Sequence, residues 1–173
     1  MKKIFLLSTA FCCLFAFSCK KEAPEPNAPS YHQDVFHCKV NGQDWSPSGG
    51  GGPFGGPSSL HATYYEDNGQ FGFLNYRETD DPPVYQVINF VSLNVTAGSS
   101  SLIRYGTVFK DRLNTGCVGY QLDTTANHDI FIEEIDRINK TIKGSFQFSA
   151  KNNCGEIVMV TEGYFDVAPF WYE

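Results

Sequence analysis

The alternation of apolar and polar residues late in the chain restricts its fold more than any other feature. Ile142, Gly144, Phe146, Phe148 and Ala150 alternate with the polar residues between them. A period of two places one set on the buried face of a β-strand and the other in water. Residues 157–167 repeat the pattern, and the apolar face that we predict there is Ile157, Met159, Thr161, Gly163, Phe165 and Val167. Turn residues at 151–155 separate the two segments, which predicts an antiparallel hairpin.

Seven other segments have strand-like patterns, and two of the connections between segments are typical hairpin turns. The segments are 34–40, 59–65, 70–76, 84–95, 102–110, 118–122 and 129–136. Asn41-Gly42 and Asp67-Asn68-Gly69 are the turns, because these residues tolerate a positive φ. Segment 84–95 is apolar on both faces, which predicts a central strand. Ile135, Ile138 and Ile142 fall at helical spacing, but turn residues at 136–140 favour strand, turn and strand.

About nine strands and no convincing helix predict an all-β fold. The two architectures that fit are an antiparallel β-sandwich and a closed barrel. The length of 173 residues, with 42% hydrophobic and 18% charged residues, fits one compact domain. We place this domain at residues 34–173.

The charge balance argues against a nucleic-acid partner. Lys and Arg number 13 against 19 Asp and Glu, for a formal net charge of −6. Binding to phosphates needs a basic face. Beyond the first few residues, the only cations that cluster in the sequence are Lys20 and Lys21, which are too few to form one.

The first 18 residues have the pattern of an export signal. Lys2 and Lys3 precede an apolar stretch over residues 4–17, which is shorter than the roughly 20 residues that a membrane span needs. Residues 16–19, Ala-Phe-Ser-Cys, resemble a bacterial lipobox. This resemblance implies a lipoprotein signal peptide over residues 1–18 and a lipidated Cys19. The alternative is an ordinary secretory signal in which Cys19 has no role.

Residues 19–33 are predicted to form a flexible tether that follows the lipidated cysteine. Pro24, Pro26 and Pro29 occur in it without any bulky apolar run. Acyl chains on one cysteine would hold the domain on a bilayer without a spanning helix. The expected location is the outer membrane. The sequence does not decide between its periplasmic face and its cell-surface face.

Three of the six cysteines remain in the domain once the signal and the lipidated residue are set aside. Cys38 alternates with Phe36 and Val40, which predicts a buried free thiol. Cys117 and Cys154 lie in turn-like sequence, so a disulfide between them is possible, although the sequence does not fix the connectivity. It would close a loop of about 38 residues.

The sequence offers no catalytic residue, no metal site and no cofactor site. The Gly- and Pro-rich segment 48–59 lacks the Lys and the following helix of a phosphate-binding loop, so we expect a surface loop, with Phe54 as a possible ligand contact. The four histidines have no metal-binding spacing. No nucleophile motif is present, and we expect a protein that is not an enzyme.

Two segments of the sequence resemble a known family. They are residues 36–45, Phe-His-Cys-Lys-Val-Asn-Gly-Gln-Asp-Trp, and the run from Ile135-Asp136 through Gly144 and Phe148 to Val167. They resemble uncharacterised lipoproteins of the Bacteroidota that contain an all-β domain of unknown function. The resemblance implies an envelope lipoprotein and no reaction.

The function that we expect is a non-catalytic binding or structural module at the outer membrane. Its partner would be an envelope protein or a glycan, and it would contact the membrane through the lipid anchor only. The candidate contact residues are Phe54, Phe170, Trp171 and Tyr172. The alternative is a lipocalin-like carrier with a small apolar ligand inside a closed barrel.

Overall fold

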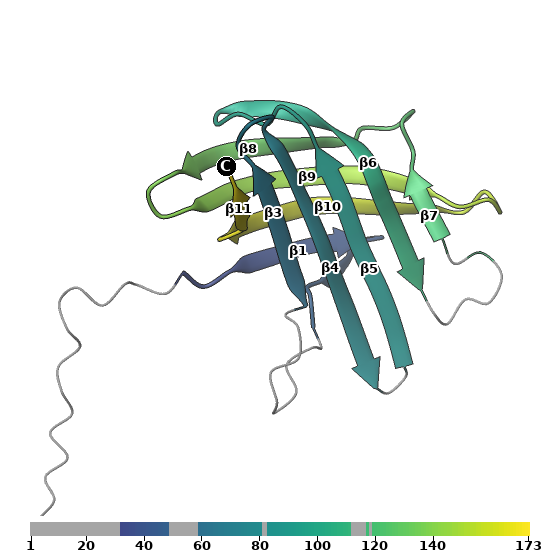
Figure 1. Cartoon of the computed structure of the whole chain (residues 1–173). Helices are drawn as coiled ribbons and strands as arrows, with labels where there is room; N and C mark the ends of the chain where they lie inside the picture. The colour runs from purple at the N-terminus through teal and green to yellow at the C-terminus, as the bar shows by residue number, and fades with distance from the viewer. Residues whose placement is uncertain (1–31, 49–58, 81–82, 112–116, 118) are drawn as a thin grey trace, which may run out of the picture. The chain divides into compact units, whose positions relative to one another are not determined.

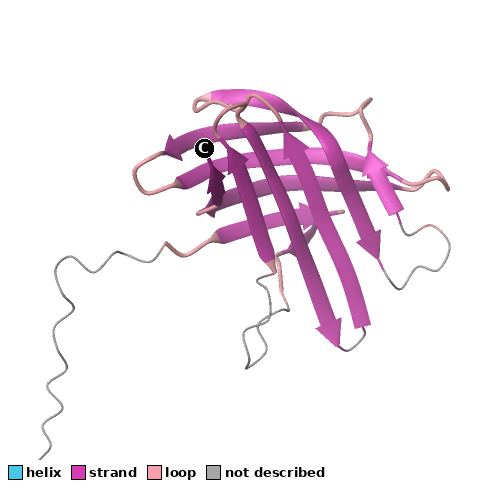
Figure 2. Cartoon of the chain, viewed as in Figure 1, coloured by secondary structure: helices cyan, strands magenta, loops and turns pink. Residues whose placement is uncertain are grey.

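The computed structural model describes residues 32–48, 59–80, 83–111, 117 and 119–173, which belong to the compact unit His32–Glu173. All regular structure among these residues is β, and no helix that could cross a membrane occurs among them (Figure 2). The strands are β1 (Val35–Val40), β2 (Gln43–Trp45), β3 (Leu60–Tyr65), β4 (Gln70–Asp80), β5 (Pro83–Ser92), β6 (Ser99–Asp111), β7 (Gly119–Leu122), β8 (Asp129–Asp136), β9 (Thr141–Lys151), β10 (Ile157–Val167) and β11 (Phe170–Tyr172).

The strands form one sheet that folds back on itself into two layers (Figure 1). The first layer has the order β11-β3-β4-β5-β6, and the second contains β8, β9, β10, β1 and β2. Strand β6 joins them, because β7 and β8 each pair with both β6 and β9. The sheet ends at β11 and β2 and is not closed into a barrel. The predicted all-β fold is therefore confirmed, with the sandwich rather than the barrel as its architecture.

All nine predicted strands are present, and two more, β2 and β11, were not predicted. Both additional strands have only three residues, too few to show a period of two. The predicted turn at Asn41-Gly42 joins β1 to β2, with φ values of 50° and 80°. Strand β8 ends at Asp136 and β9 begins at Thr141, which confirms strand, turn and strand in this region.

The predicted apolar face of β10 is wrong in its first half. Ile157 and Met159 are 53% and 54% exposed, whereas Val158 and Val160 are buried. A bulge follows, because Val160 pairs with Phe148 but the next pair is Gly163 with Phe146. The extra residue shifts the alternation by one position, so Gly163, Phe165 and Val167 point inward as predicted.

Aromatic rings fill the space between the two layers. Phe73 of β4 lies 5.0 Å, centroid to centroid, from both Phe36 of β1 and Phe165 of β10. Phe90 of β5 lies 5.0 Å from Phe146 of β9. Each buried ring removes a large apolar area from water and adds favourable edge contacts. The first layer therefore rests on a tightly packed core, which fixes the positions of the side chains on its outer face.

Candidate functional site

The outer face of the second layer carries ion pairs, beside the exposed Ile157 and Met159 of β10. Lys39 Nζ lies 2.6 Å from Glu162 Oε2, and Lys143 Nζ lies 2.9 Å from Glu133 Oε2. The hydrogen bond to Glu162 raises the pKa of Lys39, and the one to Glu133 raises the pKa of Lys143. Such partly exposed ion pairs are typical of a solvated protein surface.

Part of the outer face of the first layer, across β11, β3, β4 and β5, carries aromatic and neutral side chains in three rows. We name this surface the aromatic face and define it by its rows. They are Tyr172, Tyr65 and Gln70; Phe170, Thr63, Gly72 and Val91; and His61, Leu74 and Asn89. These rows contain no Asp, Glu, Lys or Arg. Phe170 and Leu74 are 64% and 49% exposed.

The aromatic face is hollowed at Gly72. A groove of about 320 Å³ lies there, lined by His61, Thr63, Gly72, Phe73, Leu74, Asn89, Val91 and Phe170. A Cβ on Gly72 would lie 3.1 Å from Val91 Cγ2 and 3.3 Å from the carbonyl oxygen of Phe90. The missing side chain therefore forms the floor of the groove. Its volume is at the lower end of the range for small-ligand sites.

Of the predicted contact residues, Phe170 and Tyr172 lie on the aromatic face, and Trp171 points the other way. Residues of a strand alternate between its faces, so the Trp171 ring packs on Tyr64 at 4.6 Å. Its indole Nε1 donates a hydrogen bond of 3.1 Å to Glu66 Oε2. Trp171 therefore anchors β11 to β3, and its contact with a partner stays a prediction. Phe54 and Cys19 lie outside the described residues.

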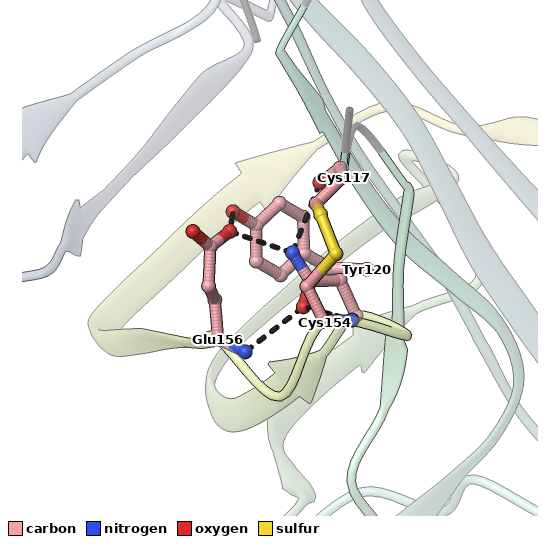
Figure 3. Close-up of a disulfide and its surroundings, with 5 residues drawn as sticks. Cys117, Tyr120, Cys154 and Glu156 are labelled. Atoms are coloured by element: carbon pink, nitrogen blue, oxygen red, sulfur yellow. Dashed lines mark hydrogen bonds between the residues drawn. A yellow bond between two sulfur atoms is a disulfide. The ribbon is translucent and has the colours of Figure 1, made fainter. Parts of the chain in front are cut away.

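A disulfide joins Cys117 to Cys154, the pairing that the sequence made possible, with a Cα–Cα distance of 6.1 Å (Figure 3). Asn152 holds the turn beside it. Its Oδ1 accepts from the backbone N–H groups of Cys154 and Glu156, and its Nδ2 donates to the Cys117 carbonyl at 3.0 Å. Tyr120 donates to Glu156 Oε2 at 2.9 Å. The polar groups around the disulfide are therefore paired with one another, which suits a structural role.

Cys38 is buried and free, as predicted. Burial raises the pKa of its thiol to about 12. A thiol that stays protonated at neutral pH is a poor nucleophile, so this position is a structural one.

Three other pockets among the described residues have charged linings. A pocket of about 600 Å³ contains Asp123 and Lys151, and one of about 440 Å³ contains Asp44 and Arg77. A third, of about 350 Å³, contains Asp129 and Glu162. Within the described part of the chain, no three His, Cys, Asp or Glu side chains gather as a metal ion would require. The groove on the aromatic face differs from these three pockets in having an uncharged lining.

Comparison with protein-family models, curated proteins and solved structures finds no match for the chain.

The sequence alone did not identify most of the groove. His61, Thr63, Leu74, Asn89 and Val91 come together only when β3, β4 and β5 pair in this register. One signal was present, since segment 84–95 is apolar on both faces. In the structure β5 is central as predicted, and its second apolar face includes Val91 in the groove.

Proposed function

We propose that the chain is a lipid-anchored, non-catalytic binding module of the cell envelope, and that the aromatic face is its contact surface. The observation that carries this proposal is the contrast between the two outer faces. One carries ion pairs beside the exposed Ile157 and Met159, whereas the three rows of the aromatic face expose Phe170, Leu74 and Tyr172 and contain no Asp, Glu, Lys or Arg. Interfaces are enriched in aromatic residues and depleted of charge at their centres.

The rigidity of the aromatic face also supports binding. Tyr65 and Tyr172 stack with ring centroids 4.6 Å apart and an interplanar angle of 11°. Phe71, Phe73 and Phe90 lie fully buried beneath the same strands. A surface that is already ordered loses little conformational entropy when a partner binds.

The packing between the layers favours this module over the lipocalin-like carrier. Phe36, Phe73, Phe90, Phe146 and Phe165 occupy the space in which a carrier would hold its ligand. A carrier needs a cavity inside the fold, whereas the groove described above is on the outside.

Attachment to the outer membrane is proposed from the sequence, through acylation of Cys19 and a tether that ends at residue 33. In polyproline geometry, at about 3.1 Å per residue, this tether would span about 40 Å. Metabolic labelling with palmitate tests the anchor. The wild-type chain should incorporate palmitate and sediment with the membrane fraction, and the Cys19→Ala chain should do neither. Labelling of Cys19→Ala would contradict the anchor.

Binding to isolated cell envelopes tests the contact surface. The Cys19→Ala chain, which would take no lipid, is mixed with envelopes and sedimented. It is compared with two double variants of the same chain, each of which replaces two exposed apolar side chains on one outer face. Phe170→Ser with Leu74→Ser should weaken binding about tenfold or more, as loss of a central aromatic contact does. The matched pair Ile157→Ser with Met159→Ser, on the outer face of β10, should leave it unchanged.

Thermal unfolding of both double variants checks that each remains folded. Equal binding by the two would contradict the proposed contact surface.

A further inference from the structure

The lining of the groove excludes a strong preference for an ionic ligand. Its eight lining residues include no Asp, Glu, Lys or Arg. A carboxylate, phosphate or ammonium group brought there would lose water without gaining an opposite charge, which disfavours its binding. The occupant is therefore expected to be neutral at the point of contact.

Polar groups at the groove argue against a purely apolar occupant. The side chains of His61, Thr63 and Asn89 line it, and among the described residues none of them forms a hydrogen bond. Together they offer a hydroxyl, an amide and an imidazole, each able to donate and accept. A hydrocarbon chain would strip water from these groups and leave them unpaired, which disfavours its binding.

One wall of the groove is an exposed aromatic ring. Phe170 lies in the same row as Thr63, Gly72 and Val91, so its ring lines the same groove as the floor at Gly72, with Thr63 between them. The face of a phenyl ring carries partial negative charge. It attracts C–H groups that are polarised by neighbouring oxygens.

We propose that this groove binds one neutral pyranose ring of an envelope glycan. The C–H face of the sugar lies against Phe170, and its hydroxyl groups bond to Asn89, His61 and Thr63. A pyranose is neutral, has an apolar face and carries hydroxyls around its edge, which is the combination that the lining requires. The proposal rests on the proposed function, because it names the partner class of the same surface.

Competition with a protein-free extract separates a glycan from other partners. Binding of the Cys19→Ala chain to untreated envelopes is measured in the presence of an envelope extract digested with proteinase K and stripped of lipid with chloroform and methanol. The extract should compete for the binding that depends on Phe170. Failure to compete would overturn the glycan proposal and leave the contact surface standing. Equal binding by the two double variants described above would instead overturn the contact surface itself.

Two substitutions at one position separate ring stacking from simple apolar contact. Phe170→Tyr keeps the ring and should bind within about twofold of the parent chain, whereas Phe170→Leu keeps apolar surface without a ring and should bind about tenfold more weakly. Equal binding by the two variants would overturn the proposal. Asn89→Leu, similar in volume and unable to form hydrogen bonds, should also weaken binding, and unchanged binding would overturn the proposed hydrogen bonds to the sugar hydroxyls.

Discussion

The ring of Phe146 packs directly on the backbone of Gly163, which pairs with it on the neighbouring strand. A Cβ on Gly163 would lie 2.6 Å from Cε1, Cζ and the carbonyl oxygen of Phe146. The same ring stacks on Phe36 at 5.1 Å and lies 5.0 Å from Phe90. Glycine at position 163 therefore sets the place of a ring that connects β1, β9 and β5.

Alanine at position 163 should destabilise the domain. No side chain fits there without moving a ring and a strand, and overpacking of this kind costs about 1 to 3 kcal/mol. We expect Gly163→Ala to lower the free energy of unfolding by at least that amount in urea denaturation. Gly119→Ala is the matched control, since a Cβ there meets no atom within 4 Å. Equal losses from the two substitutions would contradict the account of this packing.

Loss of the Cys117–Cys154 disulfide should lower stability without altering the fold. The cross-link joins residues that are 37 positions apart in the sequence. For such a loop the chain-entropy model gives a stabilisation of about 3 to 4 kcal/mol. Cys154→Ser should therefore unfold at a lower urea concentration than wild type. Dithiothreitol should lower the wild-type midpoint to that of Cys154→Ser and leave the variant unchanged. A further shift of the variant in reductant would show that another disulfide exists.

The buried thiol of Cys38 predicts a specific pH dependence. Burial raises its pKa from an ordinary value of 9.0 to about 12. As the pH rises above 9, the unfolded chain releases this proton before the folded chain does. The contribution of Cys38 is therefore complete below pH 9 and is lost as the pH approaches 12, at about 1.4 kcal/mol per pH unit.

Cys38→Ala lacks this thiol and should show a smaller fall in the free energy of unfolding between pH 8.5 and 10.5 than wild type does. Parallel curves for the two proteins would mean that the thiol is not shielded as the structure shows.

The strands were predictable because a sandwich exposes one face of each strand and buries the other. The pattern over residues 142–150 is the clearest, and Ile142, Phe146, Phe148 and Ala150 are all buried as expected. Strand β4 runs on to Asp80, beyond the predicted end at Tyr76, and β5 begins at Pro83. The residues around this turn read as a loop in sequence, but a proline is tolerated as the first residue of a strand.

The bulge in β10 could not be predicted, because residues 157–160 are Ile, Val, Met and Val. Either phase of the alternation gives an apolar inward face. Only pairing with β9 and β1 selects Val158 and Val160 for the core, and Glu162 then takes a φ of 52° at the bulge. Its ion pair with Lys39 lies on the outer face at this point.

The candidate site was predictable only at its aromatic end. The sequence named Phe170, Trp171 and Tyr172 together as candidate contacts, but it did not show that β11 would pair in parallel with β3 and bring Phe170 beside Thr63. The groove depends on three strands whose register comes from long-range pairing. Local sequence patterns do not predict that register.

Photo-crosslinking in intact cells tests the aromatic face most directly. p-Benzoylphenylalanine is placed at Tyr65 on this face or at Tyr164 on the outer face of the second layer, where the native ring lies 5.3 Å from His37. The account predicts a discrete crosslinked product from position 65 that Phe170→Ser with Leu74→Ser abolishes, and no such product from position 164. A product from position 164 alone would contradict the central claim, because it would place the partner on the opposite side of the sandwich.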